Sequence, residues 1–420
     1  MNHTPRGNRL HIAFFGRRNA GKSSLINALT NQPVAIVSTV AGTTTDPVFK
    51  SMEILPIGPV VLIDTAGIDD EGELGALRVK RSREVLSKTD LVLLVLEAGN
   101  AVSTFEEEIF ELCRERNVPV VIVLNKADQH PVTDAIKMSF QEKFGLDPVV
   151  VSTVTGEGIT ELKVAIIRSA PSTWDDLKIV GDLLQPGETA VLVIPVDKAA
   201  PKGRIILPQV QTMRDILDHG AISLVVGVQE LKEAIAQFKK KPKIVITDSQ
   251  AFLEVDANTP ADILLTSFSI LFARCKGDLG TLVAGAGSIN TLQPGDKILM
   301  AEACTHHRVE DDIGRTKLPH WLQQKVGGEL CFEWSSGGGF PDHLSDYKLI
   351  IHCGACMINR REMLARLAQA RAAKVPIVNY GVCIAHLMGI LPRALSPFPA
   401  LQHLLLQDTN KITERRSIYG

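Results

Sequence analysis

The chain has 420 residues, of which 45% are hydrophobic and 22% are charged, and its net charge is −2. This length predicts two to four domains, and the composition is ordinary for a soluble globular protein. The near-neutral charge argues against binding to nucleic acid or to an anionic membrane through overall charge. No signal peptide and no apolar run of ~18 residues is found, so we expect a cytoplasmic protein with reduced thiols.

The first region, residues 1–172, alternates short β-branched runs with amphipathic segments. "LHIAFFG", "VVLIDTAG", "DLVLLVLEA" and "VPVVIVLNKAD" are apolar almost throughout, as strands buried on both faces of a parallel sheet are. "GKSSLINALTN" and "STFEEEIFELCRERN" predict helices between such strands. This alternation predicts a doubly wound α/β domain.

A phosphate-binding loop is predicted at residues 16–23, "GRRNAGKS", which fit G-x-x-x-x-G-K-S/T between a strand and a helix. Gly16 and Gly21 allow backbone amides to face phosphate oxygens. Lys22 is expected to reach the β- and γ-phosphates, and Ser23 to be a Mg²⁺ ligand. The predicted nucleotide-binding set also includes Asn19 and Ser24.

Two further motifs predict the magnesium and catalytic groups. "AGTTTD" (41–46) supplies Thr44, which can complete the magnesium shell beside Ser23. "DTAG" (64–67) ends a strand, where Asp64 can hold magnesium through water, and Gly67 closes the motif. Together with Lys22, these residues are the predicted catalytic group.

The base specificity follows from "NKAD" (125–128) and "VST" (151–153), each at the end of a predicted strand. The carboxylate of Asp128 can accept both N–H donors on the edge of guanine, a pair that adenine lacks. Asn125 and Lys126 complete this motif, and Ser152 lies in the loop expected to cover the base. The motifs therefore predict GTP or GDP with Mg²⁺, and GTP hydrolysis.

This region resembles the GTPases of tRNA modification and ribosome assembly, the TrmE/Era type of Ras-like P-loop domain, which share "GRxNAGKSSLINAL" and "GTTxD". In part of that group, the asparagine matching Asn19 helps to bind a K⁺ ion that takes the place of an arginine finger. Ile68 follows "DTAG", and its apolar side chain cannot orient the attacking water. The resemblance therefore implies K⁺-stimulated hydrolysis as a hypothesis; the alternative is that Asn19 only braces the loop.

Two further small α/β domains are predicted after a linker. Residues 178–260 contain strands and helices such as "TAVLVIPV" and "QELKEAIAQF" and hold no cysteine. Residues 261–420 again alternate strands and helices, and their motif cysteines fall just after predicted strands, where open α/β sheets place their sites.

"CTH" (304–306) and "HCGAC" (352–356) offer thiol and imidazole groups with the local spacing of a metal site. The predicted ligands are Cys304, Cys353 and Cys356, and His306 or His352 is a candidate fourth ligand. Thiolates suit Zn²⁺ or iron–sulfur clusters. Spacing alone leaves three readings open: a structural Cys₃His zinc site, a [4Fe–4S] cluster on three cysteines, or buried thiols without metal.

The candidate histidines differ in how they are expected to lie relative to the cysteines. His352 and Cys353 would point to opposite faces of a strand, whereas His306 would share a face with Cys304. We expect His307 not to be a ligand. The isolated cysteines of the region, Cys275, Cys331 and Cys383, are predicted to be core residues.

The combination of this GTPase domain, a cysteine-free α/β unit and "CTH … HCGAC" resembles the HydF family, the GTPases of [FeFe]-hydrogenase maturation. The resemblance implies GTP-binding, dimerisation and cluster-binding domains, and a [4Fe–4S] cluster on the three cysteines. It also implies a homodimer or tetramer that receives a di-iron precursor made with two radical-SAM maturases and delivers it to the apo-[FeFe]-hydrogenase.

The same residues allow two alternative functions. The first is a regulatory GTPase of RNA modification or ribosome assembly with a structural zinc. It is disfavoured because no basic stripe with interleaved aromatics predicts a nucleic-acid surface. The second is a redox enzyme, which is weaker because the sequence holds no second cluster motif.

Overall fold

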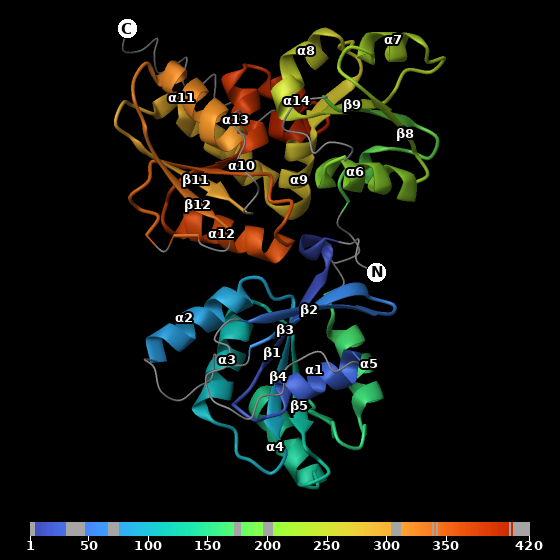
Figure 1. Ribbon diagram of the computed structural model, residues 1–420, viewed down its shortest axis with the longest axis vertical. Coiled ribbons are helices and arrows are strands. Elements are labelled where there is room, and N and C mark those ends of the chain that lie inside the picture. Colours follow the sequence, from blue (N-terminus) through green and yellow to red (C-terminus); the bar gives the residue numbers. More distant parts are fainter. Residues whose placement is uncertain are drawn as a thin grey trace. The chain divides into compact units, whose positions relative to one another are not determined.

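The computed structural model describes residues 5–30, 47–65, 75–171, 178–195, 205–303, 312–337, 340–341, 343–402 and 405. The chain divides into two compact units, Met1–Asp176 and Leu177–Gly420. Each unit is described by itself, and Figure 1 shows both with the labels used below.

Within its described residues, the first unit is built on a six-stranded sheet in the order β2-β3-β1-β4-β5-β6. β2 runs antiparallel to β3, and the other neighbours are parallel. The strands are β1 (Leu10–Phe15), β2 (Val48–Ile54), β3 (Gly58–Asp64), β4 (Leu91–Glu97), β5 (Val120–Asn125) and β6 (Val149–Val150).

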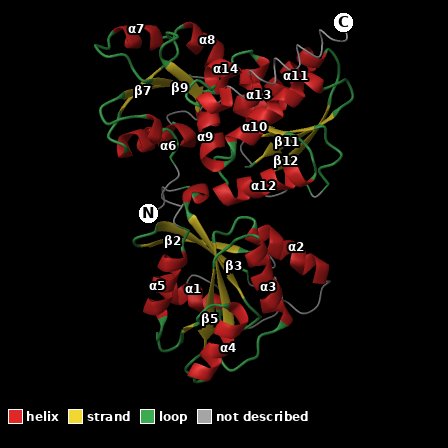
Figure 2. Cartoon of the chain, turned by 180° about the vertical axis from the view of Figure 1, so that it is seen from behind, coloured by secondary structure: helices red, strands yellow, loops and turns green. Residues whose placement is uncertain are grey.

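Helices cover both faces of this sheet, with α1 and α5 on one side and α2 and α3 on the other (Figure 2). Separate hydrophobic cores fill the two sides, which explains why every residue of β1 is buried. The helices are α1 (Lys22–Thr30), α2 (Gly75–Leu86), α3 (Thr104–Glu115), α4 (Asp134–Phe144) and α5 (Ile159–Ser169). The predicted doubly wound α/β domain is confirmed.

The second unit holds two four-stranded, all-parallel sheets in its described part, in the orders β10-β9-β7-β8 and β12-β11-β13-β14. The strands are β7 (Thr189–Val193), β8 (Ile222–Val226), β9 (Ile244–Thr247), β10 (Leu264–Ser267), β11 (Lys297–Glu302), β12 (Cys331–Ser336), β13 (Leu349–His352) and β14 (Ile377–Asn379). In each sheet the first strand is central, the second lies on one side of it, and the third and fourth lie on the other.

The helices of this unit surround the two sheets, and α12 lies on the face of the second sheet opposite to α10 and α13 (Figure 1). They are α6 (Leu207–Asp218), α7 (Leu231–Ala236), α8 (Phe252–Ala257), α9 (Phe268–Lys276), α10 (Leu279–Ala286), α11 (Leu318–Val326), α12 (Arg360–Ala372), α13 (Tyr380–Leu387) and α14 (Leu391–Ala394). β10 pairs with β9, so the first of these sheets extends past residue 260, where the sequence predicted a domain boundary.

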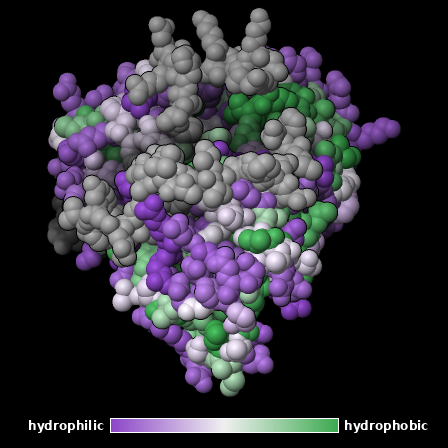
Figure 3. Space-filling model, turned by 60° about the horizontal axis from the view of Figure 1, so that its bottom comes forward, coloured by the Kyte–Doolittle hydropathy of each residue, from purple (hydrophilic) through white to green (hydrophobic). Residues whose placement is uncertain are grey.

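No helix of the described residues is long and apolar enough to cross a membrane. On the face drawn in Figure 3, hydrophilic residues make up much of the described surface, and hydrophobic residues gather in one larger patch and several smaller ones.

Candidate nucleotide and metal sites

The phosphate-binding loop leaves β1 and enters α1 in a backbone conformation that requires its glycines. Gly16 and Gly21 have φ angles of +150° and +92°. A Cβ at Gly16 would lie 2.0 Å from the carbonyl oxygen of Val95, and one at Gly21 would lie 2.1 Å from Nδ2 of Asn125. Asn19 is exposed and left-handed, with a φ of +62°. Hence the loop can turn its amides inward only with small residues at these two positions.

The side chains predicted to bind Mg²⁺ and phosphate lie together at the carboxyl ends of β1 and β3. Lys22 is 5% exposed, and its ammonium donates to the carbonyls of Gly16 at 2.6 Å and Arg17 at 3.0 Å. The hydroxyl of Ser23 donates to Asp64 Oδ2 at 2.6 Å. The ammonium, hydroxyl and carboxylate needed for a nucleotide with Mg²⁺ are thus already gathered in one place.

The residues predicted to recognise the guanine base form a second cluster around the end of β5. Asn125 is fully buried and its Nδ2 donates to the carbonyl of Ala20 at 2.9 Å, which ties this motif to the phosphate loop. Ser152 donates to Asp128 Oδ1 at 2.6 Å and so orients the carboxylate. Lys126 has a φ of +64° and pairs with Glu97 at 3.0 Å.

An anchor of the phosphate loop was missed by the sequence reading. Arg17 donates to Glu106 Oε1 at 3.0 Å and to the carbonyl of Ala101 at 2.9 Å. Glu106 is fully buried at the start of α3, where it also accepts the backbone N–H of Ser103. This ion pair holds the first turn of the loop against the β4–α3 connection. A distance of 89 residues along the chain hides it from motif analysis.

Several predicted residues lie outside the described part of the chain. They are Thr44, Gly67 and Ile68 of the nucleotide region and Cys304, His306 and His307 of the metal region. Ser24 lies within α1, partly buried. Among the residues that are described, no group of three or more His, Cys, Asp and Glu side chains could hold a metal ion.

The predicted cysteine loop begins where β13 ends. Cys353 donates its backbone N–H to the carbonyl of Ala301 at 2.9 Å, and its Sγ accepts the N–H of Ala303 at 3.1 Å. Ala355 has a φ of +55°, so the chain turns back sharply before Cys356. β11 ends beside β13 in the same sheet, and Cys304 follows two residues after its last residue, Glu302. The sheet thus brings the ends of β11 and β13, after which the two cysteine motifs follow in the sequence, to one edge.

His352 does not fit the predicted role of fourth ligand. It is fully buried, its Nδ1 donates to the carbonyl of Cys353 at 2.8 Å, and Nη1 of Arg366 donates to its Nε2 at 3.0 Å. Burial, with the neighbouring Arg366 charge, lowers its pKa to about 3. Both ring nitrogens are engaged away from the thiols, so His352 is a neutral brace between β13 and α12.

Lys276, at the end of α9, stands beneath the cysteine loop. It is 4% exposed, and its ammonium donates to three backbone carbonyls: those of Cys356 at 3.0 Å, Ile358 at 2.9 Å and Ala355 at 3.4 Å. Burial lowers its pKa to about 8, opposed by the nearby thiols, so it remains largely protonated at neutral pH. From the other side, Arg360 donates to the carbonyls of Cys275 and Gly277. The two cations fasten α9 and the loop to each other.

We therefore expect Lys276→Met to loosen the loop. Three buried carbonyls would lose their donor, which should lower the free energy of unfolding of this unit by about 1–3 kcal/mol. Affinity for the predicted metal should fall by about 10–100-fold, as is usual when a partner of a metal ligand is removed. Denaturant unfolding and release of the predicted metal to a chelator measure both effects. Lys325→Met, on an exposed face of α11, is the matched control; equal behaviour of the two variants would contradict this role.

Glu302 and Tyr380 place two further polar groups near the cysteine loop. Glu302 is 4% exposed; its Oε2 accepts from Arg315 at 3.3 Å and from Ser336 at 3.4 Å. In the described part of the chain, Glu302 Oε1 and the Tyr380 hydroxyl are buried without a hydrogen-bond partner. Both lie within 3.0 Å of the point where a Cβ of Gly314 would stand. Burial raises the pKa of the Tyr380 hydroxyl, and the nearby Cys353 and Glu302 raise it further.

The position of Glu302 makes it a candidate oxygen donor that the sequence reading missed. It is the last residue of β11 and precedes Cys304 by two residues in the sequence, a spacing at which two residues of an extended chain share a face. A buried carboxylate oxygen without a partner costs free energy unless a charged group or a metal satisfies it. The i, i+2 spacing from the cysteine was the signal that could have identified it.

The isolated cysteines divide into two classes. Cys275 and Cys383 are buried, 8% and 0% exposed, as predicted. The prediction for Cys331 is wrong, because it is exposed at the start of the edge strand β12. An edge strand has a neighbour on one side only, and the apolar flanks of Cys331 in the sequence could not reveal this.

Comparison with protein families gives three matches in chain order. The model of the 50S ribosome-binding GTPase matches residues 11–126. Those of the hydrogen maturase F dimerization and tetramerization domains match residues 179–277 and 280–397. The last two together span just over half of the chain and meet directly after α9. The first unit is accordingly a P-loop GTPase domain.

The similarity to the curated relatives described next covers well under half of the chain. The chain is 39% identical over 158 residues to the tRNA modification GTPase MnmE of Thermoanaerobacter sp., covering 37% of this chain and 34% of the relative. It is 38% identical over 159 residues to that of Exiguobacterium sibiricum, with the same coverage. The chain thus spans about a third of the length of these relatives. A solved structure of Aquifex aeolicus Era is 21% identical, covering 52% of this chain and 92% of Era, with a TM-score of 0.35.

Proposed function

Because this chain belongs to the HydF family of hydrogenase maturation GTPases, we propose that it hydrolyses GTP and carries an iron–sulfur cluster. In this proposal, the cluster holds the di-iron precursor of the [FeFe]-hydrogenase active site, and the chain delivers that precursor. The observation that carries the proposal is the position of the Cys353–Cys356 loop. It lies at the carboxyl edge of β11 and β13, within the region matched by the tetramerization domain.

GTP hydrolysis is proposed for the first unit from the arrangement of its own side chains. Lys22 would transfer its hydrogen bonds from the loop carbonyls to the β- and γ-phosphates, which develop charge during the reaction. Ser23 and Asp64 would separate to admit Mg²⁺, with Thr44 as a further proposed ligand. Asp128, oriented by Ser152, would accept the two N–H donors of guanine.

The side chains around the cysteine loop fit an iron–sulfur cluster. Cys353 and Cys356 supply soft sulfur ligands, and Cys304 is the proposed third. The N–H of Ala303, donated to Cys353 Sγ, and the buried ammonium of Lys276 favour the thiolate charge. When bound, a [4Fe–4S] cluster with an incomplete protein ligand set supplies a coordination site that a cargo ligand can occupy and leave. His306 and Glu302 are the candidates for that corner.

The partners in this proposal are the apo-hydrogenase and the two radical-SAM maturases, with a di-iron precursor carrying CO, CN⁻ and a dithiolate bridge as the cargo. The names of the two matched domains support a homodimer or tetramer. GTP turnover would act as a switch between partners, because γ-phosphate contacts order the loops of such domains and hydrolysis releases them. A cytoplasmic location remains a prediction.

The test is activation of apo-hydrogenase by the purified chain after anaerobic incubation with both radical-SAM maturases. Hydrogen evolution should appear with the wild type and be absent with the triple variant Cys304→Ser, Cys353→Ser, Cys356→Ser. Cys113→Ser, a buried cysteine of the first unit, is the control. Activation by the triple variant at the wild-type level would contradict the carrier function.

Stimulation by K⁺ is a separate prediction that rests on Asn19. Its exposed, left-handed position on the phosphate loop would allow the side-chain oxygen to reach a monovalent ion beside the phosphates. Replacing K⁺ by Na⁺ should slow GTP hydrolysis by about tenfold or more, equal to a rise of at least ~1.4 kcal/mol in the barrier. Asn19→Ala should be slow in both salts. Equal rates of the wild type in K⁺ and Na⁺ would show that Asn19 only braces the loop.

A second candidate function is favoured by the similarity to the tRNA modification GTPase MnmE. In it, the chain would regulate an RNA-modifying or ribosome-assembly step, and the cysteines would hold a structural zinc. Stoichiometric zinc in anaerobically purified protein, together with RNA binding that weakens with salt, would support it. Iron at about four atoms per chain after reconstitution would support the carrier instead.

A further inference from the structure

The two sheets of the second unit share one topology, and each therefore has a crevice at an equivalent place. In a parallel sheet whose strands run 2-1-3-4, successive connections leave the central strand in opposite directions. Ligands bind at this switch point, outside the carboxyl ends of the first and third strands. In the second sheet the switch point lies between β11 and β13, where the Cys353–Cys356 loop begins. In the first it lies between β7 and β9, a place to which no role has been given.

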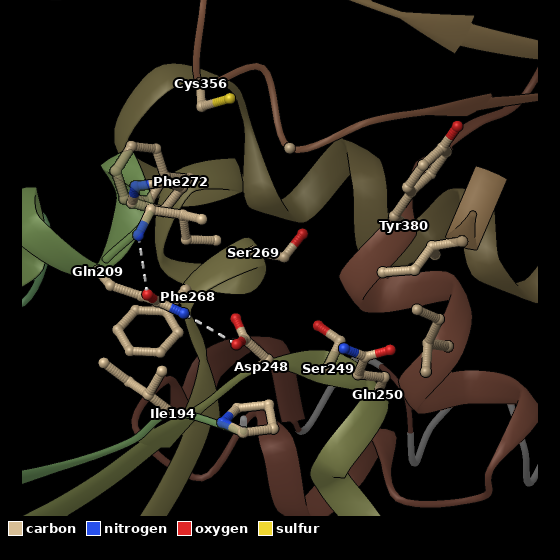
Figure 4. Close-up of a pocket in the computed structure, with 16 residues that line it drawn as sticks. Ile194, Gln209, Asp248, Ser249, Gln250, Phe268, Ser269, Phe272, Cys356 and Tyr380 are labelled. Carbon is tan, nitrogen blue, oxygen red and sulfur yellow. Dashed lines mark hydrogen bonds between the residues drawn. The ribbon is translucent and has the colours of Figure 1, made fainter. Parts of the chain in front are cut away.

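A cavity of about 320 Å³ opens at this unassigned switch point. Ile194 directly after β7, and Asp248 and Ser249 directly after β9, line it, as topology requires. The opposite end reaches Gly354 and Cys356 of the cysteine loop. Figure 4 shows Cys356 at one end of the cavity and Asp248 at the other. The volume is at the small end of the ~300–1,000 Å³ range of ligand sites.

The walls are mainly apolar. Phe268 and Phe272 of α9 form one side, with Ile194 below them, and the ring of Tyr380 stands on the opposite side (Figure 4). Ile384 of α13 adds a further apolar surface. Such a lining favours a ligand with an apolar body, because that body leaves water on binding.

A few fixed polar groups line the cavity, with Gln209 and Asp248 at the end near β9 and Ser269 between that end and Gly354. Gln209 donates to Asp248 Oδ2 at 2.9 Å and accepts the backbone N–H of Ile206 at 3.1 Å, so its amide is held in place. The oxygen of Ser269 accepts from Asn379 Nδ2 at 3.1 Å and from the N–H of Gly381 at 3.2 Å. These groups are held by bonds to the scaffold, and such fixed groups orient a bound molecule.

The charges around the cavity do not favour an anion. Among its described lining residues, Asp248 is the one carboxylate, and no Lys, Arg or His is present. Lys276 and Lys317 stand behind the walls, with their ammonium groups bonded to the loop carbonyls and to Gln250 Oε1. An anionic ligand would lose its hydration without gaining a facing cation, which costs several kcal/mol.

We propose that the β7–β9 switch point is a binding site for a small organic molecule without negative charge, with an apolar body against Phe268, Phe272 and Ile384 and one hydrogen-bond donor, such as a hydroxyl or amide group, at the Asp248 end. Because the cavity ends at Cys356, the bound molecule shields that thiol. The site belongs to the chain without any metal, so it stands or falls apart from the carrier function.

Two probes of one shape test this site on the full chain without reconstituted metal: benzyl alcohol and benzoate. Ligand-observed NMR should show benzyl alcohol binding at least about tenfold more tightly than benzoate, a difference of ~1.4 kcal/mol. Benzyl alcohol should also slow alkylation of Cys356 by iodoacetamide, followed by peptide mapping. Cys331, exposed on β12, is the internal control and should react at an unchanged rate.

Gly354→Val should fill the cavity and abolish both effects. A Cβ at Gly354 would meet only Ser269 Oγ, at 3.8 Å, so the substitution adds bulk to the cavity without a clash at that atom. Gly287→Val is the matched control, because a Cβ there meets nothing within 4 Å. Benzoate binding as tightly as benzyl alcohol would overturn the proposal. So would unchanged binding and Cys356 protection in Gly354→Val, provided that its thermal unfolding matches that of Gly287→Val.

Discussion

Serine in place of Cys353 should abolish cluster binding and leave GTP hydrolysis intact. Iron in such clusters is held by soft thiolates, and a serine hydroxyl is neither soft nor ionised at neutral pH. Cys353 also receives the N–H of Ala303, a bond that the shorter hydroxyl side chain cannot reproduce at the same position. After anaerobic reconstitution, the wild type should hold about 4 iron atoms per chain and the variant close to none.

The same preparation tests the selectivity of the effect. The GTP groups Lys22, Ser23 and Asp64 belong to the first unit and Cys353 to the second, so kcat for GTP should stay within about twofold, the size of a minor change. Cys331→Ser, on the exposed edge strand, should keep both iron and GTP hydrolysis. Full iron content and an unaltered EPR signal in Cys353→Ser would remove this residue from the proposed ligands.

Alanine in place of Lys22 should produce the opposite result, with GTP hydrolysis lost and iron retained. The ammonium is buried and already aimed at the interior of the phosphate loop, bonded to the carbonyls of Gly16 and Arg17. Without it, the charge that develops on the γ-phosphate would lose the cation that is predicted to meet it. Loss of one preorganised group of this kind lowers kcat by about 10²–10³-fold.

Phosphate release under single-turnover conditions measures this loss separately from nucleotide affinity. Lys137→Ala, on the exposed side of α4, is the control and should hydrolyse GTP at the wild-type rate. Iron content after reconstitution should equal that of the wild type in both variants. A Lys22→Ala protein that still turns over GTP within tenfold of the wild type would place the catalytic cation elsewhere.

The GTP site was predictable because its geometry is local. A strand, a tight loop and a helix follow one another in residues 10–30, and glycines are required wherever the backbone turns. Asp64, Asn125 and Ser152 each stand at or just after the carboxyl end of a strand, and in a parallel sheet all such ends lie at the same edge whatever the strand order. The apolar runs likewise predicted the buried strands, since a run that is apolar on both faces must be covered on both.

The surroundings of the cysteine loop could not be predicted in this way. The sequence offered His352 as a ligand, but its ring nitrogens are taken by Cys353 and by Arg366, fourteen residues away on α12. Lys276 bonds to the loop although it lies about 80 residues away in the sequence. Glu302 is a candidate oxygen donor because its buried Oε1 has no hydrogen-bond partner in the described part of the chain. Cys331 reads as a core residue until the strand order places it at an edge.

The sequence by itself thus determined the GTP motifs, the cysteine spacing and the α/β class, because each depends on neighbouring residues and on hydrophobic period. Tertiary structure alone decided which polar groups surround the thiols and that a cavity joins the β7–β9 switch point to Cys356. The physical reason is that hydrogen bonds and packing between distant segments depend on strand order and helix placement. Residue types along the chain do not specify either of these directly.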